Sequence, residues 1–528
     1  MHMNIYFIGM CIAMLCYLVI GFIISSKIKD ANDFYVAGRR APVVLIAGSM
    51  IASYTSTGMF MGDAAQCYEG VFTSILIFAG MQSAGYIIGA VFFGRYLRRS
   101  NVLTIPEFFG KRFRSEKVRA LAALTAIIMM TVYLLSVIQG IGTLMNVVTG
   151  VNYNVCIALA LIVFTVMTVS SGSTGVLITD TIMAGIFTAA MVIATLVISK
   201  NVGGWFNAIH ALGQNAYTAD MLSWSGKLGP LYNSGIENVA WGLIYGIVWM
   251  SVCMVGPWQS SRYLMAKDEH TVIRSAPVSA LGVFLMEFLV GMVAVMVNLA
   301  NAELPSSHVM IWAAMNLLPK FLGVVLLTGV LSAGISSATT FLSLIGASLT
   351  KDILKTDDTQ SIRIGRIVMV VVSIVVFIFA VMNLSSVFWI MFLGGAIASS
   401  SWMPVAVASI FSKRVTKAGA FAGMLSGFLG CFLLRLGAGI AGITLPVYLD
   451  PSLVGIICNI LAMVIVSAMT QVTEEEKQAR AELFIMPESE KDPAEIRKTM
   501  ASAKLSAGVG VIVAAALLIF WVIPYLNI

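Results

Sequence analysis

Long apolar runs recur along the whole chain and are separated by short polar segments. A run of roughly 18 or more apolar residues can cross the hydrocarbon core of a bilayer as an α-helix. The pattern therefore predicts an all-α integral membrane protein with about fourteen transmembrane helices. We expect these helices at 5–27, 42–62, 71–94, 120–148, 153–170, 174–199, 236–258, 273–299, 321–349, 364–382, 385–411, 417–438, 451–470 and 505–525.

Two polar stretches, 95–119 and 471–504, are expected to lie in solvent. Within the first, Thr104 and Glu107 have the spacing of a capping box with Pro106 between them, which predicts a short helix beginning there. The first apolar run of the chain is too long for the core of a signal peptide, and no basic residue precedes it. We therefore expect that run to be retained as a membrane helix.

The composition agrees with this assignment. Of 528 residues, 59% are hydrophobic and only 11% are charged, and the mean hydropathy is +0.93. A soluble domain carries about a quarter charged residues. The net charge of +7 does not indicate a nucleic-acid partner, because the Lys and Arg residues lie in short loops rather than on one basic face.

Lys and Arg residues concentrate in alternate loops, which the positive-inside rule assigns to the cytoplasm. These residues are Lys27, Lys29, Arg39, Arg40, Arg95, Arg98, Arg99, Lys111, Arg112, Arg114, Arg262, Lys267, Lys351, Lys355, Lys413, Arg414 and Lys417. The intervening loops hold few positive charges: one contains Asp63 and Glu69, and the long segment 200–235 contains only Lys227. This topology places both termini outside. Because no eukaryotic sorting signal is found, we expect the plasma membrane to be a bacterial inner membrane.

The seven cysteines have no paired spacing, and the four histidines fall in or next to predicted loops. The sequence therefore predicts no zinc or haem site, no organic cofactor and no membrane-embedded enzyme. We expect no metal other than a coupling ion such as Na⁺. The sequence leaves the oligomeric state open.

The second predicted span is a poor uninterrupted helix. Its segment 48–58 contains two glycines and five hydroxyl side chains. Such a segment favours a broken helix whose freed carbonyls and hydroxyls line an ion or solute site near the bilayer midplane. A packing seam of small residues is the alternative interpretation.

A second polar segment, in the ninth span, favours the site. Ser336 and Ser337 lie there with a backbone carbonyl one turn back. Neutral hydroxyls and carbonyls suit Na⁺, which prefers oxygen ligands. Asp180 in the sixth span supplies a negative charge, and Glu287 in the eighth is a second candidate. Either carboxylate could instead pair with a buried donor such as Arg435.

Six ordered motifs resemble the sodium/solute symporter family, which includes sodium-coupled carriers of sugars, proline, pantothenate, sialic acid and monocarboxylates. The likeness covers nearly the whole chain. The motifs are Asp33–Arg39; Thr104–Glu107 with Lys111–Phe113; Thr179–Thr181; Arg262–Lys267; Ser336–Ser337; and Pro404 followed by Lys413–Ala420.

The resemblance implies an inverted repeat of five plus five helices, each repeat opening with a broken helix. It divides the chain into an extra N-terminal helix at 1–27, a first repeat at 28–199, an extracellular loop at 200–235, a second repeat at 236–411, and C-terminal helices at 412–528 with the cytoplasmic loop 471–504. It also implies a sodium site, made of the carbonyls of Ala52, Thr55 and Ala333, the hydroxyls of Ser336 and Ser337, and the nearby Asp180.

The residues with which the family's sugar and proline carriers bind their solutes are replaced by other residues at the corresponding positions of this chain. Where the sugar branch has an Asn and a Tyr on the seventh span, this chain has Trp249 and Val252, and Tyr54 replaces the acidic residue of proline carriers. We expect a pocket with aromatic, small and hydroxyl walls that favours an organic acid or a related metabolite. Its candidate residues are Tyr54, Met59, Tyr245, Trp249, Cys253, Glu287, Ala396 and Ser399.

These observations predict a secondary transporter that couples the uptake of a small organic solute to Na⁺ by alternating access. Proton coupling through Asp180 or Glu287 is one alternative. A sensor or receptor that keeps a transporter fold is another. The expected partners are the solute, Na⁺ and the lipid bilayer.

Overall fold

The computed structural model describes residues 4–25, 31–383 and 385–527. The predicted boundary between 27 and 28, together with Lys27 and Lys29, lies outside the described residues. The side chains of 170–174 and of several residues in the first helix are likewise not described.

The described chain is helical, with one isolated backbone bridge between Ala41 and Ala266. Its α-helices are α1 (Ile5–Ser25), α2 (Ala31–Val36), α3 (Val43–Tyr54), α4 (Ala64–Gln66), α5 (Phe72–Gly89), α6 (Arg95–Arg99), α7 (Ile105–Phe113), α8 (Glu116–Thr149), α9 (Tyr153–Asn201), α10 (Trp205–Gln214), α11 (Gly235–Val255), α12 (Pro257–Met265), α13 (Glu269–Ala300), α14 (Val309–Asn316), α15 (Lys320–Ala347), α16 (Asp358–Met382), α17 (Val387–Phe411), α18 (Lys417–Ala441), α19 (Pro451–Ala468), α20 (Glu474–Glu482), α21 (Pro493–Leu517) and α22 (Ile523–Leu526). Short 3₁₀ and π segments join some of them, including the π segments Met59–Asp63 and Cys67–Val71.

Eleven helical stretches of the described chain are long and apolar enough to cross a membrane, and two shorter apolar helices, Ile5–Cys16 and Tyr153–Val169, accompany them. The predicted spans 42–62 and 71–94 fall in one long stretch, Val43–Arg99. It turns at Gly70, whose φ of 104° lies in the left-handed region that favours glycine, so the turn needs no polar loop. The predicted spans 153–170 and 174–199 both fall in α9. The count of fourteen therefore stays a prediction.

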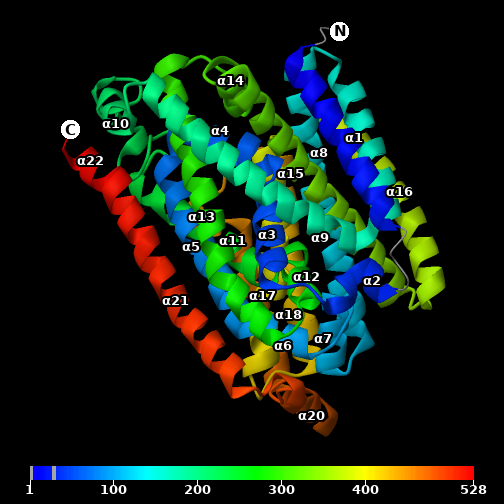
Figure 1. The fold of residues 1–528 in the computed structure, drawn as a ribbon. Helices are drawn as coiled ribbons and strands as arrows, with labels where there is room; N and C mark the ends of the chain where they lie inside the picture. Colours follow the sequence, from blue (N-terminus) through cyan, green and yellow to red (C-terminus); the bar gives the residue numbers. More distant parts are fainter. Residues whose placement is uncertain (1–3, 26–30, 384, 528) are drawn as a thin grey trace.

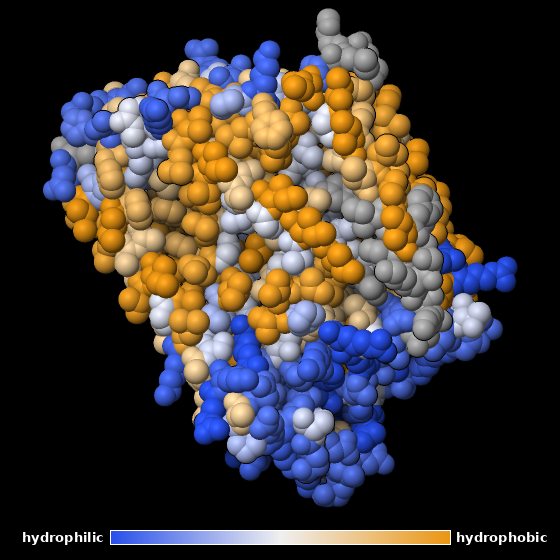
Figure 2. Space-filling model, in the orientation of Figure 1, coloured by the Kyte–Doolittle hydropathy of each residue, from blue (hydrophilic) through white to orange (hydrophobic). Residues whose placement is uncertain are grey.

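The spans form an inner and an outer group. The stretches containing α11, α13, α15 and α17 are mostly buried inside the protein, whereas α16, α18, α19 and α21 expose most of their surface. Figure 1 shows α21 lying along one flank of the molecule and α16 along the other. The exposed surface of the outer helices is apolar and forms a belt between two hydrophilic ends (Figure 2). A multi-pass membrane protein presents such a belt to lipid.

The described parts of the loops predicted to face the cytoplasm share one end of the molecule, where α2, α6, α7 and α20 lie, and the start of α1 and the helix α22 lie toward the opposite end (Figure 1). Backbone and side-chain bonds hold this end together. The Ala41 N–H donates to the Met265 carbonyl at 3.1 Å. Arg98 donates through Nε to the Ala266 carbonyl at 2.6 Å and through Nη2 to the Lys267 carbonyl at 2.8 Å.

The short helix predicted after Thr104 is present as α7. The Thr104 hydroxyl accepts from the Glu107 N–H at 3.1 Å, and Pro106 lies in the first turn, where its missing N–H costs nothing. The Glu107 carboxylate accepts from the N–H of Leu103 at 2.8 Å, not from that of Thr104. The helix start is therefore confirmed, but the reciprocal half of the predicted capping box is shifted by one residue.

Candidate ion and solute site

The helix predicted to be broken in the second span ends at Tyr54, near the middle of its apolar run. Thr55 has φ −67° and ψ 63°, and the helical path resumes after Ser56. The Thr55 N–H still donates to the Ile51 carbonyl at 2.9 Å. The break removes the partners of the next helical hydrogen bonds, so backbone carbonyls become available to another ligand.

A second break lies between α11 and α12 in the seventh span. Gly256 has φ −56° and ψ 132°, and Pro257, which has no N–H to donate, begins the next helix. Breaks are therefore present in both spans for which the family resemblance implied them.

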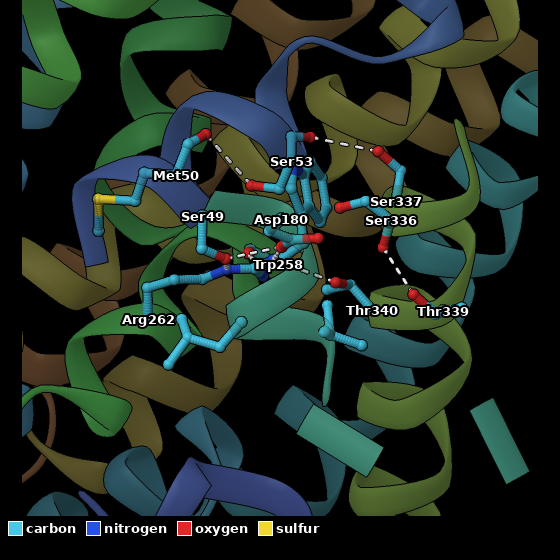
Figure 3. A network of polar contacts seen from close by, with 12 residues as sticks. Ser49, Met50, Ser53, Asp180, Trp258, Arg262, Ser336, Ser337, Thr339 and Thr340 are labelled. Carbon is cyan, nitrogen blue, oxygen red and sulfur yellow. Dashed lines mark hydrogen bonds and ion pairs between the residues drawn. The ribbon is translucent and has the colours of Figure 1, made fainter. Parts of the chain in front are cut away.

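The α3 break faces α15 at the two adjacent serines (Figure 3). Ser337 Oγ donates to the Ser53 carbonyl at 3.3 Å. Ser336 Oγ is buried beside Asp180 and makes no hydrogen bond of standard geometry to another described residue. Ala52 and Ala333, whose carbonyls were expected to bind sodium, are buried on the same two helices. The structure thus brings the α3 and α15 parts of the predicted sodium site together.

Asp180 of α9 joins this site with only 1% of its surface exposed. Its Oδ2 accepts from Ser49 Oγ at 2.7 Å and from Arg262 Nη2 at 3.3 Å (Figure 3). Its Oδ1 has no hydrogen bond of standard geometry within the described chain, although Ser336 is its neighbour. One carboxylate oxygen and one hydroxyl are therefore available to a cation, next to the carbonyls of a broken helix.

Arg262 is a central residue of this site. The sequence pattern had placed Arg262 in a cytoplasmic loop. It lies in α12 with 1% exposure, donates through Nε to Ser49 Oγ at 3.1 Å and through Nη2 to Thr340 Oγ1 at 3.0 Å, and also donates to the Trp258 carbonyl. The assignment was wrong because the chain continues as a helix after Gly256 and carries the guanidinium back into the protein. A Pro directly after a helix-breaking Gly is the signal that could have indicated this second half-helix.

Arg435 does not pair with Asp180. Its guanidinium carbon lies 5.0 Å from the ring centroid of Trp389, and the side chain borders a cavity of about 590 Å³. The lining of this cavity includes Tyr232 and Trp241, and the chain around Tyr232 belongs to the segment 200–235 that was predicted to be extracellular. We call this cavity the vestibule.

Three of the predicted solute-contacting residues form an aromatic cluster beneath the vestibule. The ring centroids of Tyr54 and Trp249 are 5.7 Å apart, and those of Tyr245 and Trp249 are 6.2 Å apart. Trp241, in the wall of the vestibule, stacks on Tyr245 at 4.9 Å with an interplanar angle of 13°. All these rings are buried, so the aromatic cluster is closed to the vestibule in this conformation.

The other predicted solute residues are buried on neighbouring elements. Cys253 lies one turn beyond Trp249 and packs against α5 at Gly85. Met59 lies in the π segment that follows the α3 break, and Ala396 and Ser399 lie on α17. Their contact with the solute stays a prediction. Glu287 lies on α13 with Gln82 of α5 as its neighbour, away from the Asp180–Arg262 pair.

Asp63 also lies elsewhere than predicted: the sequence pattern had placed it in an outer loop. It lies in the π segment Met59–Asp63 with 2% exposure, and its Oδ1 accepts from the Tyr245 hydroxyl at 2.7 Å. The helix that restarts after the α3 break continues past Asp63 and so keeps this carboxylate inside. The polar residues near it had suggested a loop.

The sequence model that describes the sodium:solute symporter family matches residues 34–427, which is more than half of the chain. This chain belongs to the sodium:solute symporter family. Its Ser336–Ser337 helix, the α3 break and Asp180 all lie inside the matched region.

Curated relatives agree with this membership. The symporter is 25% identical to a sodium/proline symporter of Salmonella typhimurium over 453 residues, which cover 79% of this chain and 85% of the relative. It is also 25% identical to the osmoregulated proline transporter OpuE of Bacillus subtilis, with 89% of this chain and 94% of the relative covered. The family consists of transporters, and these relatives support Na⁺-coupled symport.

Solved structures show the same fold. A Na⁺-coupled sialic acid symporter in a substrate-bound, outward-open state superposes with a TM-score of 0.73 at 17% identity, covering 89% of this symporter and 99% of that chain. A nucleobase-cation-symport-1 family transporter in a closed conformation superposes with a TM-score of 0.53 at 12% identity, covering 85% and 98% of the two chains.

Proposed function

We propose that this protein imports a small organic solute together with Na⁺ by alternating access. The observation that carries the proposal is the meeting of Ser336, Ser337 and Asp180 at the α3 break, where Ser336 Oγ and Asp180 Oδ1 lie beside each other and make no hydrogen bond of standard geometry to a described residue. A site of neutral oxygens with one carboxylate binds Na⁺ but lets it leave again. We assign the ligands to the carbonyls of Ala52, Thr55 and Ala333, the two serine hydroxyls and Asp180.

Coupling follows from the elements that these ligands join. A bound Na⁺ would tie α3 to α15 and α9, and so stabilise the conformation in which the solute site is formed. For a solute of zero net charge, moving one Na⁺ down 100 mV contributes about 2.3 kcal/mol, which supports roughly fifty-fold accumulation of the solute. One Na⁺ per cycle is sufficient for uptake of such a solute, whereas a monoanionic acid carried with one Na⁺ moves no net charge and relies on the Na⁺ concentration gradient or on a second Na⁺.

The solute site of the proposal is the aromatic cluster of Tyr54, Tyr245 and Trp249, with Met59, Cys253, Ala396 and Ser399 around it. The solute would enter through the vestibule and cross the closed Trp241–Tyr245 stack. An organic acid or a related metabolite suits the mixed walls of such a site, and an amino acid is supported by the relatives named as proline transporters. We further propose the five-plus-five inverted repeat, supported by the paired breaks at Thr55 and Gly256.

The test is a solute-induced current from purified protein in liposomes on a solid-supported membrane, with Na⁺ present or replaced by K⁺. Sugars, amino acids, monocarboxylates, pantothenate and sialic acid form the panel. We expect a current that requires Na⁺ and is lost in the double variant Ser336→Ala, Ser337→Ala. The matched control is Ser332→Ala, because the Ser332 hydroxyl bonds within its own helix to the Thr328 carbonyl at 2.6 Å.

A current that persists in K⁺ and follows the pH gradient would contradict Na⁺ coupling and support the proton alternative. No current from a folded preparation with any solute would favour a sensor.

A further inference from the structure

Two carboxylates lie inside the membrane-spanning region, apart from the proposed sodium site. Asp63 follows the α3 break, and Glu287 lies on α13 with 1% exposure. They are close enough to interact electrostatically with each other. Both also interact electrostatically with Tyr54, and Asp63 accepts a hydrogen bond from Tyr245. The carboxylate pair therefore borders the aromatic cluster that we assign to the solute.

The pair lacks a counter-charge within the described chain. Neither carboxylate forms an ion pair there. The buried guanidinium of Arg262 is occupied by Asp180, and that of Arg435 lies over Trp389 at the vestibule. An ionised carboxylate inside a membrane protein is costly unless a cation or hydrogen bonds compensate it. The described chain therefore supplies no positive charge to the pair, and a cation from outside the chain could supply it.

Several polar atoms at and near the Asp63–Glu287 pair lack a hydrogen-bond partner among the described residues. The side chains of Glu287 and the fully buried Gln82 lie in contact with each other, but neither carboxylate oxygen of Glu287 and neither amide atom of Gln82 makes a hydrogen bond of standard geometry to a described residue. Trp249 Nε1 in the aromatic cluster is also without a partner in the described structure. Buried polar groups are rarely left unsatisfied, so several in one place indicate a ligand.

The surrounding rings indicate which cation fits. Phe78 lies 4.5 Å from Tyr245 and 6.1 Å from Trp249, measured between ring centroids. Aromatic faces next to carboxylates bind organic ammonium groups, which gain cation–π attraction. Na⁺ instead prefers a shell of oxygens, which the Ser336–Ser337 site already offers. The aromatic surroundings thus favour an organic cation over a second Na⁺.

We infer that the transported solute carries a positively charged ammonium group, which Asp63 and Glu287 hold against Tyr245, Trp249 and Phe78. This inference rests on the proposed symport. It narrows the solute to amines, quaternary ammonium compounds and amino acids. A carboxylic acid without an amine does not match the pair, whereas the Trp249 indole N–H could bind the carboxylate of an amino acid.

The test compares solutes that differ only in the cationic nitrogen. The pairs are L-proline and tetrahydro-2-furoate, L-alanine and L-lactate, choline and 3,3-dimethyl-1-butanol, and ethanolamine and ethylene glycol. Na⁺-dependent uptake of each radiolabelled solute is measured in proteoliposomes, because one Na⁺ that moves with the anionic tetrahydro-2-furoate or L-lactate gives no net current. We expect at least one nitrogen-bearing member to give a half-saturating concentration about tenfold or more below that of its isostere.

Variants locate the effect at the pair. Glu287→Gln keeps the shape of the side chain and removes its charge. It should therefore raise the half-saturating concentration of the ammonium solute about tenfold or more. Glu287→Asp, which restores the charge on a shorter side chain, should recover part of the affinity. Glu303→Gln, in an exposed loop, is the matched control and should behave as wild type. Thermal stabilisation by Na⁺ alone shows that each variant is folded and binds the ion.

Two outcomes overturn this inference and leave Na⁺ coupling intact. One is Na⁺-dependent transport of only the isosteres or of none of the eight solutes, while Na⁺ still stabilises the protein. The other is a Glu287→Gln variant that carries the ammonium solute with wild-type affinity, in which case the pair holds a proton or a second Na⁺. If Na⁺ neither stabilises the protein nor supports any current, the proposed function itself fails.

Discussion

The guanidinium of Arg262 and the carboxylate of Asp180 form an ion pair of 3.3 Å between α12 and α9, and both side chains are 1% exposed. Ser49, which lies in α3 before its break, forms hydrogen bonds with both partners. The pair therefore connects α12, the second half of the other broken helix, to α3. These contacts hold Asp180 beside the other proposed sodium ligands and leave its Oδ1 available to bind Na⁺.

Removing one partner of this pair should strongly destabilise the protein, because it leaves the other charge buried and alone. We expect Arg262→Gln to lower the free energy of unfolding by about 3–5 kcal/mol. The double variant Arg262→Gln, Asp180→Asn should recover part of that loss. Thermal unfolding of the four proteins in one detergent gives the double-mutant cycle. Additive effects of the two substitutions would show that the pair does not act as a unit.

A second prediction concerns the contacts of Arg98 at the end of the molecule that is predicted to face the cytoplasm. Its two hydrogen bonds to the Ala266 and Lys267 carbonyls hold the chain after α12 against α6. Each charged hydrogen bond contributes about 1.5–3 kcal/mol. Arg98→Ala should therefore shift the population toward a conformation in which this end is open.

Labelling of a cysteine introduced at Ser261 measures that shift. Ser261 is buried and borders a very small cavity beside Arg262. A methanethiosulfonate reagent should modify it at least about tenfold faster in the Arg98→Ala background. Arg414→Ala, at an exposed loop position, is the control. Equal labelling rates in all backgrounds would show that Arg98 does not hold this end closed.

A third prediction tests the packing of α5 against α11. A Cβ added at Gly85 would lie 2.6 Å from the Met250 carbonyl oxygen and 2.9 Å from its Cα, so the two helices would have to separate. Gly85→Ala should lower the free energy of unfolding by about 1–3 kcal/mol. Gly437→Ala meets no atom within 4 Å and should be neutral or slightly stabilising, as is usual for Ala in a helix. Equal effects of both substitutions on the melting temperature would contradict the close approach of the helices.

A fourth prediction concerns the hydrogen bond between Tyr245 and Asp63. Tyr245→Phe removes the donor and leaves the buried carboxylate with one bond fewer, which costs roughly 1–3 kcal/mol. We expect reduced thermal stability in the absence of solute and a smaller deficit when a saturating solute is present. A deficit that is the same with and without solute would place this bond outside the solute site.

The membrane spans and the α3 break could be predicted because each depends on a local pattern. Apolar length identifies a span, and glycines with hydroxyl residues around Thr55 identify a break. The boundary between the second and third spans was predicted at 63–70, and the chain does turn at Gly70, but this turn requires only a left-handed glycine, so most of the predicted polar loop is helical. The two misassigned charges, Asp63 and Arg262, each lie near the end of an apolar run, where local hydropathy cannot distinguish a loop from a half-helix that folds back inside.

The partners of those charges depend on tertiary packing. Asp63 and Tyr245 are 182 residues apart, and Arg262 and Asp180 are 82 apart. No periodicity in the sequence indicates which helices become neighbours. The roles of Ser336, Ser337 and Asp180 could nevertheless be proposed in advance, because a carboxyl group inside a membrane helix is rare unless it has a functional partner, and two adjacent hydroxyls supply neutral oxygen ligands for Na⁺.

The most direct test of the central claim is equilibrium binding of radioactive Na⁺ to the purified protein without solute. The account predicts saturable binding that weakens about tenfold or more in Ser336→Ala and in Asp180→Asn, while Ser332→Ala on the same helix binds as wild type. Wild-type Na⁺ affinity in Ser336→Ala and Asp180→Asn, with both variants folded, would contradict the assignment of the sodium site to the α3 break and α15.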